Sequence, residues 1–348
     1  MPWHSLTSNR CFPKCHLFVH AKDLKDLYDL PLSSSAGLPY RLGHARRSDV
    51  WQETVAQVEY WLSHSHTKPD IPDVLAFAIS HLSDPGEEKV RAVWGYPNSM
   101  FVLEACYFYP LMYAIRSVPN PIAWGWEVMK AGMLRLHRTS IQYKQFIGLD
   151  WRKFDKTVSS DIIRDAFNIF REKIVPTRYA YFEGWDWIVD YFIHTPIRMA
   201  DGSRYIKLGG VPSGTCFTQL IDSVTNAIII NYLFHHQFGR FPDFELKVKS
   251  FCTFNRQEIE FLGFTNANGT PTRHPDDWLL AFCLPERTDN DVVDTASRAL
   301  GLLYANSGCS SSIHAALTIF IQNLEHQHVD FKKTKPIIII LPMTSVLN

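Results

Sequence analysis

Two aspartates near the middle of the chain have the type and spacing to hold a divalent cation. Asp150 and Asp155 lie five residues apart, where a strand-like run at 145–150 gives way to a loop. Carboxylate oxygens are the ligands that Mg²⁺ prefers, and the end of a strand is a rigid place to mount them. Two solvated acids that flank a turn would have the same spacing, so this pair alone does not identify a site.

A glycine-rich segment farther along combines unusual backbone freedom with a polar helix face. It has the sequence Gly-Gly-Val-Pro-Ser-Gly-Thr-Cys-Phe-Thr (209–218) and leads into a predicted helix at 215–234. Glycines adopt backbone conformations that other residues do not, so such a loop can approach a nucleic-acid backbone closely. Thr218, Asp222 and Asn226 follow at intervals of four and share one helix face. A glycine-rich helix start with polar residues facing water is the alternative.

Two cations precede these motifs on a predicted strand. Lys89 and Arg91 alternate in the segment Lys-Val-Arg-Ala-Val-Trp-Gly-Tyr-Pro (89–97), so their side chains would project from the same face. Arginine offers a planar fork of donors and lysine a point charge, and together they could grip a triphosphate. A solvated edge strand with two cations would explain the segment equally well.

The elements that must position these residues are helices mixed with short hairpins, which indicates an α+β fold rather than a doubly wound sheet. Ser159 or Ser160 is a candidate N-cap, and the Asp-Gly at 201–202 predicts a hairpin turn. Helices are predicted at about 49–64, 100–140 with interruptions at Pro110, Pro119 and Pro121, 160–172, 215–234 and, from Asp276 onward, through 287–305 and 311–324, and strands or hairpins at 83–97, 145–150, 196–214 and 258–264.

The composition is that of a folded chain without overall charge. Of the 348 residues, 46% are hydrophobic and 14% aromatic, and 35 basic side chains balance 35 acidic ones. The chain is long enough for two or three subdomains. Zero net charge argues against nucleic-acid binding over the whole surface, but it allows a local basic channel.

Cysteine use and apolar runs argue against zinc-binding, secreted and membrane classes. The seven cysteines are scattered, and Cys11 and Cys15 form a close pair without a second pair to complete a zinc site. The odd count and the lack of an apolar leader indicate a reducing compartment. The apolar run 337–341 is shorter than the roughly 18 residues of a membrane span and predicts a buried strand or an atypical chain end.

The three motifs occur in an order that resembles viral RNA-dependent RNA polymerases. Glu-Ile-Glu-Phe-Leu-Gly-Phe (258–264), Asn-Gly-Thr-Pro-Thr-Arg (268–273) and Leu-Pro-Glu-Arg (284–287) extend the likeness. It is strongest toward the polymerases of partitiviruses and similar double-stranded RNA viruses, and it runs from about residue 40 to 305. The resemblance implies a right-hand fold of fingers, palm and thumb. It also implies extension of RNA from nucleoside triphosphates on an RNA template, with two Mg²⁺ (or Mn²⁺) ions.

The resemblance assigns roles to the two aspartates and to the cations. Asp150 would match the metal-binding catalytic acid of the first palm motif, and Asp155 the acid that helps to sense the ribose 2′-OH. Lys89 and Arg91 would match the fingers residues that grip the triphosphate. Lys249, or else Lys247 beside it, would match the general acid for pyrophosphate.

The resemblance also assigns nucleotide-binding roles to the glycine-rich segment. Ser213, Gly214 and Thr218 would match the flexible loop and helix start that contact template and ribose. Asn226 would match a downstream asparagine of the same helix. Asp222 occupies a position where many relatives carry asparagine, which puts sugar discrimination by this face in doubt.

The same resemblance implies a domain organisation and partners. Residues 1–140 would form the N-terminal region and fingers, 141–265 the palm with an inserted fingers segment at about 173–208, and 266–348 a truncated, thumb-like helical region. The expected partners are RNA template and product, nucleoside triphosphates and a viral capsid protein, with no membrane. The expected location is the cytoplasm or the interior of the virion.

One motif that the resemblance requires has no counterpart, because the sequence contains no Gly-Asp-Asp. Its hairpin should lie between the helix 215–234, which ends near His235, and the strand near 258–264. Because Lys247 already begins the next recognisable segment, only 236–246 are left over. Two five-residue strands and a two-residue turn need about twelve residues. Pro242 in this stretch would also block ladder pairing. We therefore expect a palm without its central catalytic hairpin.

Other acids do not replace the missing motif. Asp243 and Glu245 are the only acids in the leftover stretch. Asp276 and Asp277 follow the strand instead of preceding it, and they suit the first turn of a helix better.

The missing motif determines the expected activity. In two-metal catalysis, acids of both palm motifs bind the ions together. The chain is therefore predicted to be a very poor polymerase. Each loss of about 1.4 kcal/mol in transition-state stabilisation slows the reaction tenfold, and the expected loss amounts to several such factors. An internal deletion in a polymerase is one interpretation. A non-catalytic RNA- or nucleotide-binding remnant of an integrated viral gene is another. A reverse transcriptase is less favoured, because the Pro-Ser-Gly motif is typical of RNA polymerases.

Overall fold

The computed structural model describes residues 18–40, 45–81, 89–118, 122–126, 131–144, 146–149, 151, 153–172, 180–236, 251–285, 289–306 and 308–334. The chain divides into two compact units. Unit 1 comprises residues 1–79, 90–122 and 152–244, and unit 2 comprises residues 80–89, 123–151 and 245–348. Both units are therefore assembled from segments that are far apart in the sequence.

The sheet of unit 1 has the strand order β2-β1-β4-β5. Strand β1 runs parallel to β4, with Val74 opposite Ile197, and β4 pairs antiparallel with β5. The predicted hairpin is confirmed, because the chain turns between β4 and β5 at Gly202, whose φ is +86°. The strands are β1 (Val74–His81), β2 (Lys89–Gly95), β4 (Pro196–Arg198) and β5 (Arg204–Ile206).

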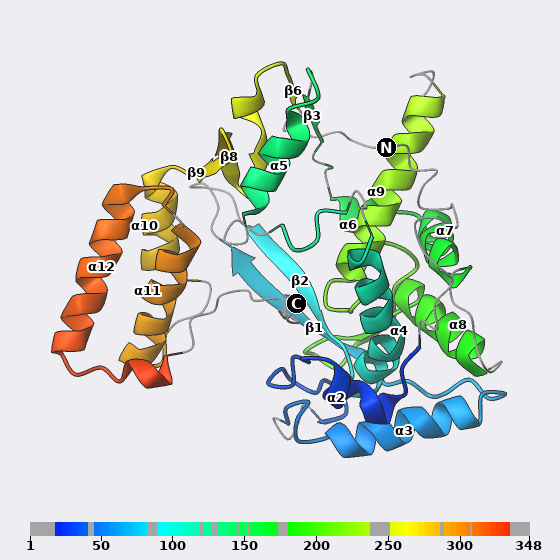
Figure 1. Ribbon diagram of the computed structural model, residues 1–348. Coiled ribbons are helices and arrows are strands. Elements are labelled where there is room, and N and C mark those ends of the chain that lie inside the picture. Colours follow the sequence, from blue (N-terminus) through cyan, green and yellow to red (C-terminus); the bar gives the residue numbers. More distant parts are fainter. Residues whose placement is uncertain are drawn as a thin grey trace. The chain divides into compact units, whose positions relative to one another are not determined.

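The other regular elements described in unit 1 are helices (Figure 1). Helix α7 packs against both α8 and α9, and α4 packs against α3 and α8. The Ser159 side chain caps α7 by accepting a hydrogen bond from the Ile162 amide, as predicted. The helices are η1 (Ala21–Asp23), α2 (Leu24–Leu27), α3 (Trp51–Ser63), α4 (Asn98–Arg116), α6 (Phe154–Thr157), α7 (Ser160–Arg171), α8 (Ala180–Ile193) and α9 (Thr218–His235).

The predicted interruption at Pro110 is wrong, because α4 continues through it to Arg116. Pro110 is buried within a helix whose residues are almost all buried. Tertiary packing of an apolar helix therefore outweighs the loss of one intrahelical hydrogen bond, which proline cannot donate.

Aromatic side chains form the centre of unit 1. Phe167 of α7 lies within 5.0–5.6 Å, centroid to centroid, of the rings of Trp185, Phe192 and Phe217. All four side chains are at most 1% exposed. Because Phe217 precedes α9 directly, its burial fixes the point at which the glycine-rich segment enters the helix.

Unit 2 contains two small antiparallel sheets and a helical part. Strand β3 pairs with β6, and β7, β8 and β9 form a meander. The predicted strand over 258–264 is interrupted, because Leu262 and Gly263 both adopt positive φ and turn the chain from β7 into β8. The strands are β3 (Phe146–Gly148), β6 (Phe251–Thr253), β7 (Glu260–Phe261), β8 (Phe264–Ala267) and β9 (Thr270–Thr272).

The helices of unit 2 share a core with the β7–β9 meander. Helices α11 and α12 lie side by side (Figure 1), and α10 packs on α11. Buried Met133, Phe264, Trp278, Ile313 and Leu317 make up this core. The helices are α5 (Gly132–Ser140), η4 (Arg256–Glu258), α10 (Pro275–Cys283), α11 (Val292–Asn306), α12 (Ser311–His326) and η5 (Phe331–Lys333).

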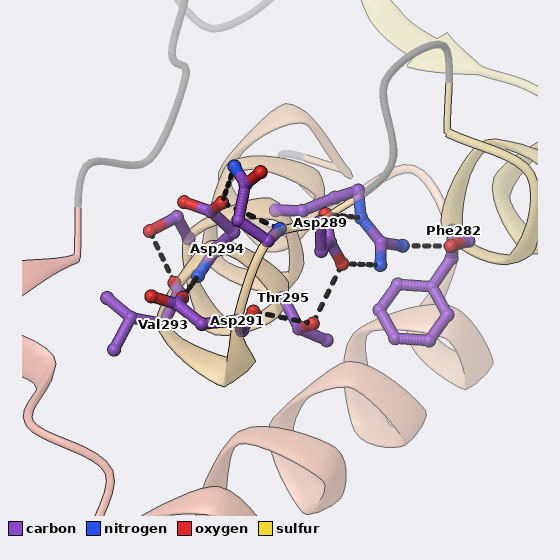
Figure 2. A network of polar contacts seen from close by, with 9 residues as sticks. Phe282, Asp289, Asp291, Val293, Asp294 and Thr295 are labelled. Atoms are coloured by element: carbon purple, nitrogen blue, oxygen red, sulfur yellow. Dashed lines mark hydrogen bonds and ion pairs between the residues drawn. The ribbon is translucent and has the colours of Figure 1, made fainter.

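A polar network joins α10 to α11 in unit 2 (Figure 2). The Arg298 guanidinium donates to both carboxylate oxygens of Asp289 and to the Phe282 carbonyl. Asp289 also accepts from the Thr295 hydroxyl at 2.7 Å. The guanidinium lies 4.8 Å from the centroid of the Phe282 ring. This network fixes the start of α11 against the end of α10.

Candidate functional site

Three of the sequence motifs meet in unit 1 through backbone hydrogen bonds. The Val211 amide donates to the Asp155 carbonyl at 2.6 Å, and the Gly210 amide donates to the Val158 carbonyl at 3.0 Å. The glycine-rich segment is thereby bonded to the loop and short helix that carry Asp155. On its other side, the Trp94 amide of β2 donates to the Ser213 carbonyl at 3.0 Å.

Two glycines make these close approaches possible. Gly210 has a φ of +73°, and a Cβ there would lie 2.5 Å from the Asp155 carbonyl oxygen. Gly214 has a φ of +117°, and a Cβ there would lie 2.3 Å from the Trp94 carbonyl oxygen. Both the backbone conformation and the lack of space exclude a side chain. The two glycines thus allow the backbone of this segment to pack directly against the backbones of Asp155 and Trp94 in unit 1.

Threonine hydroxyls shape the start of α9. Thr215 Oγ1 accepts from the amides of Phe217 at 2.9 Å and Thr218 at 3.1 Å. The Thr218 hydroxyl donates back to the Pro212 carbonyl at 2.7 Å. These bonds satisfy amides that a helix start otherwise leaves unpaired. Ser213 is half-buried and Gly214 is exposed, so the tip of the segment faces solvent.

Asp155 and Asp222 form an acidic pair across this segment. Asp155 is exposed in the first turn of α6, and Asp222 is half-buried one turn into α9. Burial and the negative charge of Asp155 raise the pKa of Asp222 from 3.8 to about 7. Among the atoms that the structure describes, Asp222 Oδ1 is buried without a hydrogen-bond partner. The predicted alternative of a water-facing polar row does not hold for Asp222.

The remaining two residues of the predicted helix face lie one turn before and one turn after Asp222. Thr218 begins α9, and Asn226 lies two turns along the helix, half-buried. The structure therefore confirms that these three positions share a helix face.

Two buried ionisable side chains, Glu104 and Arg47, lie next to the segment. Glu104 of α4 is 1% exposed, and its Oε2 accepts from the Cys216 amide at 2.8 Å. Arg47 is 9% exposed, and its guanidinium lies 3.7 Å from the centroid of the Phe101 ring. Burial raises the pKa of Glu104 from 4.5 to about 8, against the opposing effects of its hydrogen bonds to Cys216 and the Arg47 charge.

Lys207 holds the other end of the segment. Its ammonium donates to the carbonyls of Gly209 at 3.0 Å and Gly210 at 2.6 Å. Burial lowers the pKa of Lys207 to about 8. Lys207 therefore holds the loop through two of its carbonyl oxygens.

The sequence signalled some of these supporting residues weakly. Glu104 is the one charged residue in the apolar run Met-Phe-Val-Leu-Glu-Ala-Cys-Tyr-Phe (100–108), and such an isolated charge is a signal that could have found it. Arg47 and Lys207 carry no comparable signal, because their partners are main-chain and aromatic groups brought together by the fold.

Several predicted site residues lie outside what the structure describes. Asp150 lies outside the described residues, as do Lys247, Lys249 and the acids Asp243 and Glu245. Lys89 and Arg91 lie on the described backbone of β2, but their side chains are not described. These predicted roles stay predictions, and so does the missing hairpin, because 237–246 of its stretch 236–246 lie outside the described residues.

The structure confirms the interpretation of Asp276 and Asp277 as a helix start. Both lie in the first turn of α10, which begins at Pro275. Asp277 forms an ion pair with Arg273 at 3.4 Å. Acids at this position interact favourably with the helix dipole.

The described residues offer no candidate for two other types of site. Within the described parts of the chain, no cluster of three or more His, Cys, Asp or Glu side chains could hold a metal ion. No helix among the described residues combines the length and apolar character of a membrane span.

Comparison with known proteins identifies the family. A model of the family "Viral RNA-dependent RNA polymerase" matches residues 15–300. The chain belongs to this family.

The RNA-directed RNA polymerase of Cryptosporidium parvum virus 1 (strain KSU-1) is 30% identical over 246 residues, which cover 68% of this chain and 44% of that protein. The RNA-directed RNA polymerase of Atkinsonella hypoxylon virus (isolate 2H) is 27% identical over 327 residues, covering 68% of this chain and 48% of that protein. The chain spans about half the length of these curated relatives.

Solved structures agree on the fold. The RNA-dependent RNA polymerase of a human picorbirnavirus matches 94% of this chain and 73% of its own, with a TM-score of 0.65 and 13% identity. The Sicinivirus 3Dpol RNA-dependent RNA polymerase matches 94% of this chain and 82% of its own, with a TM-score of 0.61 and 15% identity. The predicted α+β polymerase fold is therefore confirmed.

Proposed function

We propose that this member of the viral RNA-dependent RNA polymerase family binds an RNA template and nucleoside triphosphates, and that it transfers nucleotides poorly. One observation carries the binding part. The Asp155 loop, the glycine-rich segment and β2 are bonded to one another through their backbones, although they are up to about 120 residues apart. The polymerase resemblance assigns nucleotide contacts to all three of these segments.

The residues take the following roles under this proposal. Asp155 and Asp222 face the ribose, with Asp222 neutral for part of the time at neutral pH because its pKa is about 7. A protonated carboxylic acid donates a hydrogen bond, as an asparagine amide would. Ser213, Gly214 and Thr218 form the loop and helix start that follow the template backbone, and Asn226 extends the polar face. Lys89 and Arg91 bind the triphosphate, and Lys249 is the general acid.

The metal proposal rests on Asp150. Asp155 and Asp222 lie close enough to interact electrostatically, and among the described residues neither belongs to a metal cluster of three or more groups. The described residues therefore do not supply a complete ligand set, and Asp150 would have to add to it. A bound Mg²⁺ or Mn²⁺ would stabilise negative charge on a transferred phosphoryl group.

The catalytic deficit follows from the sequence. No Gly-Asp-Asp occurs in the chain, so the second set of acids that a two-metal mechanism needs is not supplied by that motif. This observation also favours the second candidate function, an RNA- or nucleotide-binding protein without catalysis.

The proposed location is the cytoplasm or the virion, with a capsid protein as a further partner. The proposed fingers, palm and thumb keep the boundaries predicted from the sequence.

Binding and extension assays test the two functions separately. Fluorescence anisotropy with a labelled single-stranded RNA should show binding at low salt that weakens as salt is raised. Primer extension on an RNA template with Mg²⁺ or Mn²⁺ should show incorporation several decades below a complete family member. Asp155→Ala should weaken nucleotide binding, whereas Asp165→Ala, an exposed acid on α7, should not. Robust incorporation that Asp150→Ala abolishes would refute the catalytic deficit, and no RNA binding at low salt would refute the binding function.

A further inference from the structure

Glu104 is an isolated carboxyl in the core of unit 1. It lies on α4 among apolar neighbours and is 1% exposed. Its Oε2 accepts a hydrogen bond from the Cys216 amide at 2.8 Å, although the two residues are 112 positions apart. The bond therefore links the middle of α4 to the glycine-rich segment just before α9.

Burial of this group is costly for the fold. A carboxyl taken out of water destabilises the folded state unless its oxygens are paired. In the described part of the chain, Glu104 Oε1 and Arg47 Nε are both buried without a hydrogen-bond partner. Arg47 packs on Phe101, one helical turn before Glu104, so the cation lies on the same side of α4. An apolar residue at this position would destabilise the folded state less than the buried carboxyl does. Glu104 therefore has a role other than stabilising the fold.

The position of the Cys216 amide explains that purpose. Thr215 Oγ1 satisfies the amides of Phe217 and Thr218, and Glu104 satisfies the amide of Cys216. The Trp94 amide holds the Ser213 carbonyl at the other end of the turn. Between these two attachments lies Gly214, which is exposed. Glu104 and β2 therefore fix the exposed tip of the segment from two sides.

We propose that Glu104 is a positioning residue: by holding the Cys216 amide, it keeps the exposed turn at 213–216 in the conformation that binds RNA. This inference rests on the proposed function. Glu104 does not touch the RNA and acts through the backbone of the turn. Arg47 supports it by offsetting part of the charge of the buried carboxyl.

Three variants of the full chain test this role. Glu104→Met removes the acceptor but fills the space, and Glu104→Gln keeps an oxygen that can accept from Cys216. Glu59→Met removes a half-buried carboxyl of α3 far along the chain from the turn and serves as the matched control. Hydrogen exchange of the Cys216 amide and anisotropy with labelled single-stranded RNA are measured for each, together with the melting temperature.

The expected pattern separates positioning from stability. Glu104→Met should speed exchange at Cys216 by roughly tenfold and weaken RNA binding by about five- to tenfold, as the loss of one hydrogen bond to a carboxyl predicts. Its melting temperature should change little, because removal of the unpaired Oε1 offsets loss of the hydrogen bond from the Cys216 amide. Glu104→Gln should restore both exchange and RNA affinity to within about twofold of the parent, and Glu59→Met should leave both unchanged.

The contrary outcomes are distinct. Equal RNA affinity of Glu104→Met and the parent would overturn the positioning role and leave the proposed function intact. If the parent chain does not bind RNA at all, the proposed function fails, and the positioning role fails with it. If Glu104→Met does not fold, Glu104→Asp replaces it, because the shorter side chain withdraws the carboxyl by about 1.5 Å and should speed exchange and weaken binding in the same direction.

Discussion

The turn before α9 in unit 1 and the Arg298 network in unit 2 both rely on buried or half-buried charge, but they satisfy it differently. Arg298 and Asp289 pair with each other and with neighbouring main-chain and hydroxyl groups (Figure 2). Around the turn, by contrast, Glu104 Oε1, Arg47 Nε and Asp222 Oδ1 are buried without partners among the described residues. The first arrangement stabilises a helix junction, whereas the second leaves buried polar atoms without partners, at the expense of stability.

The largest difference between the regions should come from the backbone. Gly214→Ala would place a Cβ 2.3 Å from the Trp94 carbonyl oxygen at a φ of +117°. We expect a loss of about 3–5 kcal/mol in the free energy of unfolding, or a displaced turn, together with loss of RNA binding. Urea denaturation and anisotropy measure the two effects.

Gly202→Ala is the matched control for this substitution. Gly202 also has a positive φ, +86°, but nothing lies within 4 Å of the position of its Cβ. The loss there should be about 1–2 kcal/mol, from backbone strain alone. Equal losses at the two glycines would show that the contact between the turn and β2 does not constrain the site.

A pH dependence should appear in the turn region. The pKa of Asp222 is raised from 3.8 to about 7, so the folded state binds its proton more tightly than the unfolded state does. The contribution to stability is complete below pH 3.8 and is lost as pH rises toward 7, at up to about 1.4 kcal/mol per pH unit. Asp222→Asn removes this loss, so the variant should gain stability over the parent between pH 4 and pH 7.

The measurement is the difference in free energy of unfolding between Asp222→Asn and the parent at pH 4.5, 6 and 8. Asp165→Asn, on the exposed side of α7, controls for the loss of one acid. A difference that does not change over this range would contradict the raised pKa of Asp222. The same experiment on Glu104→Gln should give a similar rise, because the pKa of Glu104 is about 8.

The sequence predicted the local features of the site better than its supports. The period of apolar residues and the Ser159 cap located α7, and the interval of four placed Thr218, Asp222 and Asn226 on one face of α9. These features depend on residues a few positions apart. The bond from Glu104 to Cys216 spans 112 positions, and no local pattern encodes such a distance. For the same reason, sequence periodicity did not reveal that packing carries α4 through Pro110.

The Arg298 network should affect stability without affecting binding. Arg298→Ala removes the pairing with Asp289, the bond to the Phe282 carbonyl and the contact with the Phe282 ring. We expect a loss of about 2 kcal/mol in the free energy of unfolding and unchanged RNA affinity. Arg135→Ala, at an exposed position of α5, should stay within about 0.5 kcal/mol of the parent. Weaker RNA binding by Arg298→Ala would remove the distinction between the two regions.

The smallest effect is expected at two turns of the β7–β9 meander that have similar backbones but different residues. Leu262 and Asn268 have φ values of +53° and +55°, and each is followed by a glycine with positive φ. Asparagine tolerates the left-handed region better than leucine does. Leu262 is also 59% exposed, so its side chain loses little packing on replacement. Leu262→Asn should therefore raise the free energy of unfolding by roughly 0.5–1 kcal/mol, and Asn268→Leu should lower it by a similar amount. A loss of stability in Leu262→Asn would mean that packing of the exposed leucine within unit 2 outweighs the strain of its backbone. The turn at Leu262 would then be constrained by its neighbours, as the turn at Gly214 is.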